Sequence, residues 1–364
     1  MPKAVTKASC RCAQYMAIAL FLLFAAGRAE AQPAQTSGAD HWAIAKDVQI
    51  PSEPGVILAA TLYLPAAHSK GPYPLAVLIG GRGPNGRGGF SEIIKRLAAD
   101  GIASLEYDKR GTGQSTGTYE EDAYRLAADA AAAVAAMRRR SDIVGNRIAL
   151  IGHSQGGVVA PAVAAADPKI AAVVTLAGNV GEGLSYVRKG IYRQMMTMIP
   201  ADREALGSAA VDAVMALLQA RVDGRDGETI ARLRANVLDR FEAAGFPRPQ
   251  AEQALAMIDV PDAWKASKLR SASDLKALHI PVLAIFGTKD PMALNDAPAA
   301  RAALASNRRA RVVILDGLGH SFQEGAVTGA PDEVSKLGPY LGSPRLAILV
   351  GDWLRDTLSS RGGR

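Results

Sequence analysis

The sequence predicts an α/β fold, in which a mostly parallel central sheet is flanked by helices and a helical segment is inserted between two strands. Six short apolar runs alternate with amphipathic or alanine-rich stretches. Strands that are apolar throughout are typical of a parallel sheet covered on both faces. Between the fourth and fifth runs, from Gly181 to Ala277, apolar residues recur at helical spacing instead.

Each strand follows from a local pattern. Residues 47–65 alternate around Pro54-Gly55, which predicts a β-hairpin at a sheet edge. The parallel strands are expected at residues 74–80, 102–107, 147–152, 170–178, 280–287 and 311–317.

The inserted helical segment, residues 181–278, is interpreted as a cap, or lid, over the carboxyl ends of the strands, where ligands bind in such sheets. Residues 32–180 and 279–364 then form the core of the protein. The alternative is a helical subdomain that packs and has no further role. The large side chains of the segment either line an adaptable pocket or form an apolar core: Met195, Met196, Met198, Met215, Met257 and Trp264.

The first residues are typical of an export signal. A basic start is followed by an apolar run at residues 13–26, which is shorter than the roughly 20 residues that a membrane-spanning helix needs. Ala29-Glu30-Ala31 then matches the small-x-small pattern of a signal-peptidase site. We therefore expect a signal peptide at residues 1–31, export to the periplasm or the medium, and no stable membrane anchor after cleavage.

Cleavage at that site leaves 333 residues with a net charge of +4 and no cysteine. An oxidising compartment would meet neither a disulfide nor a reactive thiol, so stability must come from an ordinary core. The basic residues do not cluster, so no nucleic-acid partner is expected. Neither a metal-ligand cluster, a dinucleotide fingerprint nor a P-loop is found in the sequence, and no metal or cofactor is expected.

Two segments match the G-x-S-x-G pattern of serine nucleophiles: GQSTG at 113–117 and GHSQG at 152–156. A nucleophile elbow needs a buried strand, a tight turn and a closely packed helix. GHSQG follows an apolar strand and precedes a helix of small residues, which makes Ser154 the candidate nucleophile. GQSTG follows a polar, glycine-rich loop and precedes an acidic segment, which makes Ser115 a loop residue.

The order Ser, acid, His along the chain selects the partners of Ser154. Of the two histidines that follow it, His279 precedes a strand, whereas His320 follows one and lies at the carboxyl edge. His320 is therefore the candidate base, and His153 a packing or pocket residue. The orienting carboxylate is assigned to Asp290, with Asp316 as the alternative, while Asp296 is interpreted as a helix cap. Such a carboxylate holds the imidazole tautomer and stabilises the imidazolium.

Acyl transfer also needs N–H donors for the developing oxyanion. One donor is expected from the backbone of Gln155, the residue after the nucleophile. The other is expected from the glycine-rich loop after the first parallel strand, at Gly81 or Arg82. Asp108 and Arg110 follow the next strand at the same edge, so we expect them to form an ion-paired support for this loop.

Five blocks of the sequence are together more specific than either G-x-S-x-G segment alone: GGRGPNGRGG, LEYDKRGTGQSTG, ALIGHSQGGVVAP, AIFGTKD and DGLGHSFQEGAVTG. With these blocks the chain resembles the α/β-hydrolase fold, and within it bacterial serine esterases of the dienelactone-hydrolase and prolyl-oligopeptidase-like group. The resemblance implies a triad of Ser154, Asp290 and His320, with backbone donors near Arg82 and Gln155. The chain departs from the family pattern at Arg82, where a small serine is common.

These observations favour a serine hydrolase that cleaves a small-molecule carboxylic ester through an acyl-enzyme intermediate. A peptidase or an acyl-thioesterase would use the same triad, so both remain alternatives. From another class, the chain could be an inactive hydrolase fold that serves as a binding protein.

Overall fold

The computed structural model describes residues 42–68, 71–196, 198–259, 266–290, 296–329, 333 and 336–359. The expected signal peptide and Trp264 lie outside these residues. The described chain divides into two compact units: a helical unit, residues 181–270, and a sheet unit that contains all of the strands described. Each unit has a hydrophobic core of its own.

The sheet unit is built on an eight-stranded sheet of order β1-β2-β4-β3-β5-β6-β7-β8. The N-terminal hairpin pairs antiparallel and joins β4 antiparallel, and every other pair is parallel. The predicted mostly parallel sheet with an edge hairpin is therefore confirmed. The strands are β1 (Ala43–Glu53), β2 (Val56–Pro65), β3 (Tyr73–Ile79), β4 (Ala103–Tyr107), β5 (Ile143–His153), β6 (Ala172–Leu176), β7 (Val282–Gly287) and β8 (Ala310–Leu315).

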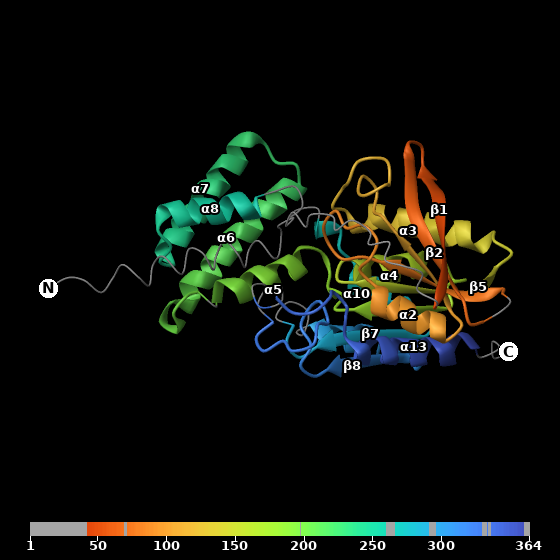
Figure 1. Cartoon of the computed structure of the whole chain (residues 1–364). Helices are drawn as coiled ribbons and strands as arrows, with labels where there is room; N and C mark the ends of the chain where they lie inside the picture. The colour runs from red at the N-terminus through yellow and green to blue at the C-terminus, as the bar shows by residue number, and fades with distance from the viewer. Residues whose placement is uncertain are drawn as a thin grey trace. The chain divides into compact units, whose positions relative to one another are not determined.

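Helices cover both faces of this sheet, which explains why every residue of β4, β6 and β7 is buried. Helices α2 and α13 pack against each other (Figure 1). Helices α3, α4, α10 and α11 pack in succession. Their bounds are α2 (Ser91–Ala99), α3 (Ala123–Arg138), α4 (Gly156–Ala166), α10 (Ser271–Lys276), α11 (Ala297–Ala303) and α13 (Pro344–Ser359).

The helical unit is inserted between β6 and β7, where the sequence predicts a helical segment. It contains α5 (Gly183–Met196), α6 (Glu204–Val222), α7 (Gly227–Ala243), α8 (Arg248–Ile258) and the short 3-10 turns η1 (Ala201–Arg203) and η2 (Ala266–Lys268). The unit ends at Arg270, rather than at residue 278 as expected. The difference arises because α10 packs on α4 and α11 of the sheet unit, and Leu275 and Leu278 join the core of that unit.

The apolar side chains of the helical unit face one another. Met195 lies in its core, and Met196, Met198, Met215 and Met257 pack against that core. Residues 201–222 are long and apolar enough to cross a membrane by length and composition alone, with a mean hydropathy of 1.3. Val211, Val214, Leu217 and Leu218 from this stretch are fully buried within the unit, so we assign the helix to the core of the unit.

Candidate active site

A sharp turn between β5 and α4 presents Ser154. Its backbone has φ of 52°, in the left-handed region, and its N–H donates to the Leu176 carbonyl of β6 at 2.8 Å. The flanking glycines leave no room for side chains: a Cβ on Gly152 would lie 1.9 Å from the Gly156 carbonyl oxygen, and one on Gly156 would lie 2.1 Å from the Ile79 carbonyl oxygen. The strain and the crowding match the strand-turn-helix elbow expected for GHSQG.

The structure brings Ser154, His320 and Asp290 together. The Nε2 atom of His320 lies 3.0 Å from the Ser154 Oγ, and its Nδ1 lies 2.9 Å from the Asp290 Oδ2. The Asp290 side chain is fully buried, whereas that of His320 is 17% exposed. Asp290 follows β7 and His320 follows β8, so two neighbouring strands deliver both groups to the edge where β5 delivers the serine.

The alternative residues have other partners. His279 is exposed and precedes β7, at the amino end of that strand. Asp316 accepts a hydrogen bond from the Thr288 hydroxyl at 2.9 Å. Asp296 occupies the N-cap position of α11, but its side chain makes no capping hydrogen bond and instead accepts from the Val180 N–H at 3.2 Å. Asp296 therefore holds the predicted cap position of α11, without a side-chain capping hydrogen bond.

His153 lies behind His320 and is only 2% exposed. Its Nε2–H donates to the His320 carbonyl at 2.9 Å, and its Nδ1 accepts from the Tyr340 hydroxyl. Burial lowers the pKa of His153 to about 3, so the ring is neutral at physiological pH. His153 thus supports the backbone of His320, in agreement with a packing role.

The loop after β3 lies directly against the serine, because a Cβ on Gly81 would come within 3.3 Å of the Ser154 Cβ. A Cβ on Gly81 would also lie 3.2 Å from the Tyr340 hydroxyl oxygen, so the missing side chain of Gly81 lets Tyr340 approach this loop. The backbone N–H groups of Gly81 and Arg82 both stay predicted oxyanion donors in this loop. On the other side of the serine, none of the backbone hydrogen bonds described outside helices and strands has the Gln155 N–H as its donor.

Lys109 and Glu121, which no sequence motif marks, lie beside this loop. The Lys109 ammonium donates to the carbonyls of Gly81 and Gly83 and to the Gln155 side chain. Glu121 accepts from the Gln155 amide and forms an ion pair with Arg82 at 3.5 Å. The Arg82 side chain therefore has a carboxylate partner. Lys109 stands between Asp108 and Arg110 in the sequence, and nothing in the pattern distinguishes a buried cation from an exposed one.

Asp108 connects the loop after β3 with the GQSTG turn. Its carboxylate accepts from the Arg87 N–H at 2.8 Å and from the Gln114 N–H at 2.9 Å, and it pairs with the Arg87 guanidinium at 3.2 Å. Ser115 braces the same turn: its hydroxyl donates to the Asp108 carbonyl at 2.7 Å and accepts from the Ala59 N–H at 2.8 Å.

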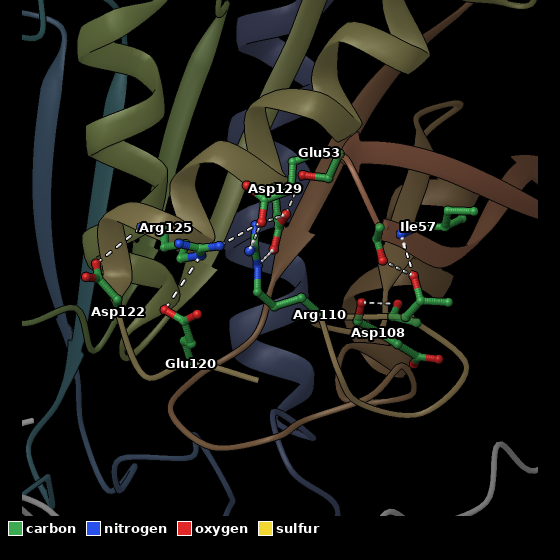
Figure 2. A network of polar contacts seen from close by, with 12 residues as sticks. Glu53, Ile57, Asp108, Arg110, Glu120, Asp122, Arg125 and Asp129 are labelled. Carbon is green, nitrogen blue, oxygen red and sulfur yellow. Dashed lines mark hydrogen bonds and ion pairs between the residues drawn. The ribbon is translucent and has the colours of Figure 1, made fainter. Parts of the chain in front are cut away.

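Arg110 lies away from the oxyanion loop, contrary to expectation. It is 1% exposed and binds Asp129 of α3 through two hydrogen bonds of 2.7 Å and Glu53 of β1 through one of 2.6 Å (Figure 2). Successive side chains leave a strand end in different directions, so Lys109 reaches the oxyanion loop while Arg110 ties the hairpin to α3.

Comparison with known proteins agrees with this fold. The model of the alpha/beta hydrolase family matches residues 76–337. Esterase EstD of Thermotoga maritima is 24% identical over 305 residues, which cover 80% of this chain and 63% of EstD, so the match spans less than two thirds of that relative.

Solved structures are similar over most of the chain. The Pyrococcus furiosus esterase Pf2001 aligns with a TM-score of 0.54 and 15% identity, over 90% of this chain and 100% of that one. The alpha/beta hydrolase GrgF from Penicillium sp. sh18 aligns with a TM-score of 0.54 and 19% identity, over 87% of this chain and 99% of that one. At these identities the likeness concerns the fold.

Proposed function

The chain belongs to the alpha/beta hydrolase family, and from this membership and the geometry around Ser154 we propose that it is a serine hydrolase that cleaves carboxylic esters. The observation that carries the proposal is the pair of hydrogen bonds made by His320: its Nε2 accepts from the Ser154 hydroxyl at 3.0 Å, and its Nδ1–H donates to the Asp290 Oδ2 at 2.9 Å. Esters are favoured as substrates because EstD and Pf2001 are both named esterases.

In the proposed mechanism, Ser154 attacks the ester carbonyl while the His320 Nε2 takes its proton. Asp290 keeps the proton of the neutral imidazole on Nδ1, which leaves Nε2 free to act as the base, and it stabilises the imidazolium that forms. The imidazolium then protonates the departing alkoxide. Water, deprotonated by the same histidine, attacks the acyl-Ser154 ester. The acid then leaves, and the imidazolium returns its proton to the Ser154 oxygen.

The developing oxyanion requires two N–H donors in a fixed place. We assign one to Gln155, which lies at the start of α4, where the helix dipole also favours a negative charge. The other is assigned to Arg82. Its neighbour Gly81 approaches Ser154 closely enough to place the next peptide group beside the reacting carbonyl.

A covalent probe and a substrate series test the proposal. A fluorophosphonate should label the wild type, and Ser154→Ala should abolish the labelling. If the wild type is not labelled and hydrolyses no ester, the chain is an inactive hydrolase fold used for binding. p-Nitrophenyl esters of increasing acyl length, compared with aminoacyl amides and acyl-CoA thioesters, identify the leaving group. Faster turnover of amides or thioesters than of every ester would replace esterase by peptidase or thioesterase.

The helical unit is proposed as a cap that selects the substrate. It is inserted after β6, at the carboxyl edge of the sheet, where insertions commonly bear on the ligand. Its hydrophobic core shares no residue with that of the sheet unit, so a chain in which residues 181–270 are replaced by a short linker should still fold. If the unit is a cap, this variant should lose the acyl-length preference of the wild type. An unchanged preference would show that the unit does not select the substrate.

Export is proposed from the N-terminal pattern alone. Expression of the full chain in a bacterial host should give a mature protein outside the cytoplasm that begins at Gln32. Cell fractionation and N-terminal sequencing test this, and an intact N-terminus in the cytoplasmic fraction would contradict it.

A further inference from the structure

Lys109 is a buried cation whose contacts concentrate on the loop beside Ser154. It is 4% exposed and follows β4. Its ammonium donates to the Gly83 carbonyl at 3.1 Å, to the Gln155 side-chain oxygen at 3.0 Å and to the Gly81 carbonyl. One side chain thus holds residues from the segments on both sides of the nucleophile.

The contact between Lys109 and the Gly81 carbonyl also fixes the direction of the next backbone N–H. The Gly81 carbonyl and the Arg82 N–H belong to one planar trans peptide, so they point in opposite directions. Holding the oxygen therefore sets the direction of the N–H. Asn85 donates to the same oxygen at 2.9 Å, so two donors lock this peptide from the side opposite to its N–H.

Glu121 completes the clamp. It accepts from the Gly83 N–H at 3.2 Å and from the amide of the Gln155 side chain. Gln155 therefore lies between the ammonium of Lys109 and the carboxylate of Glu121, which fixes its side chain, and its backbone bears the second candidate oxyanion donor. The ion pair of Arg82 with the same carboxylate brings the oxyanion loop into this network.

We propose that Lys109 is a positioning residue for ester hydrolysis, which acts by orienting the Arg82 and Gln155 backbone N–H groups toward the oxyanion. The inference rests on the proposed function. A preorganised donor is effective because it needs no rearrangement when the charge develops, and a displacement of about 1 Å can cost roughly 100-fold in rate.

The buried position of Lys109 disfavours the charged form of its side chain. Burial lowers its pKa to about 8, because the ammonium is removed from water. Its hydrogen bonds and the Tyr119 ring, 5.9 Å from the Nζ, offset part of that cost. Arg110, the next residue, is equally buried but binds Asp129 and Glu53, so it provides a matched control with no contact to the oxyanion loop.

The test is Lys109→Met, which keeps an unbranched side chain one atom shorter and removes its donors. For a p-nitrophenyl ester, kcat per fluorophosphonate-titrated site should fall about 100-fold, while KM changes less than threefold. The affinity for a trifluoromethyl ketone, which forms a tetrahedral adduct with the serine, should fall by the same factor as kcat/KM. Arg110→Met should lower the melting temperature and leave kcat per titrated site within about threefold.

Wild-type kcat in a folded Lys109→Met variant would overturn the proposal, as would a loss of kcat equal to that of Arg110→Met. Glu121→Gln is a milder second variant, and it tests the positioning role if Lys109→Met does not fold. It should lower kcat about tenfold by loosening Gln155 and Gly83, and an unchanged kcat would overturn the clamp. Failure of the proposed function itself looks different, because the wild type would then hydrolyse no ester at all.

Discussion

The two G-x-S-x-G segments of this chain share a sequence pattern and differ in what their serines touch. Ser115 and Ser154 are each 9% exposed, so burial does not separate them. The Ser115 hydroxyl is held by two backbone groups, the Asp108 carbonyl and the Ala59 N–H. The Ser154 hydroxyl is hydrogen-bonded to the imidazole of His320, which is itself hydrogen-bonded to the carboxylate of Asp290. The difference in chemistry therefore comes from the partners and not from the motif.

The glycines of the two segments also differ in what surrounds them. In the 152–156 segment, added Cβ atoms would overlap backbone carbonyls at about 2 Å. In the 113–117 segment, a Cβ on Gly113 would lie 2.4 Å from the Asp108 Oδ2, and one on Gly117 would lie 2.8 Å from the Val56 Cγ2. The space at the glycines of the first segment is limited by backbone atoms, which cannot move unless the sheet moves. The space at the glycines of the second segment is limited by the ends of side chains.

The largest expected effect is on the two hydroxyls. Ser154→Ala should lower kcat for an ester by at least about 10⁴-fold, because no nucleophile remains to form the acyl-enzyme. Ser115→Ala should keep kcat within about twofold, since its hydroxyl contacts only backbone. Initial rates on a p-nitrophenyl ester measure both, and the reverse outcome would exchange the roles of the two serines.

A smaller effect is expected from the glycines. Gly156→Ala should lower kcat about 100-fold, because the new methyl group meets the Ile79 carbonyl and displaces either the elbow or the oxyanion loop. Gly117→Ala should keep kcat within about threefold and lose roughly 1–3 kcal/mol of stability, since φ is +89° there. Equal losses of kcat in the two variants would contradict the contrast between backbone and side-chain contacts.

The strands that lead into the two segments carry buried groups with opposite pKa shifts. Burial raises the pKa of Glu106 on β4 to about 7 and lowers that of His153 on β5 to about 3. Between pH 4.5 and 7 the folded chain keeps the Glu106 proton that the unfolded chain has lost, so this group lowers stability as pH rises. His153 acts oppositely: from pH 3 to 6.5 the unfolded chain binds a proton that the folded chain excludes.

Glu106→Gln removes the first of these two contributions. The free energy of unfolding of the variant, relative to the wild type, should therefore increase by about 2–3 kcal/mol between pH 4.5 and 7. Urea denaturation across this range measures the difference. A difference that does not change with pH would show that Glu106 titrates alike in the folded and unfolded chains.

The smallest effect is the stability cost at Ser115. Ser115→Ala leaves the buried Ala59 N–H without the hydroxyl that accepts its hydrogen bond and removes the donor to Asp108. A loss of about 1–2 kcal/mol in the free energy of unfolding is expected. Ser115→Thr, which keeps the hydroxyl, is the control, and an unchanged stability of the alanine variant would show that the brace contributes nothing.

Much of the fold was accessible from the sequence because its signals are local. Buried parallel strands are continuous apolar runs, and the elbow at Ser154 is encoded by a strand, two glycines and a helix of small residues within about twenty positions. Chain order and strand ends sufficed to favour His320 over His279 and Asp290 over Asp316 as partners near the serine.

Tertiary structure alone decided the rest. Lys109 and Arg110 are neighbouring basic residues with similar burial, yet one binds the oxyanion loop and the other binds α3. A Cβ on Gly81 would lie 3.2 Å from the hydroxyl oxygen of Tyr340, a residue about 260 positions away in the chain. Local patterns determine which edge of a sheet a residue reaches. Which atom a long side chain or a peptide group contacts at that edge depends on elements that only folding brings together.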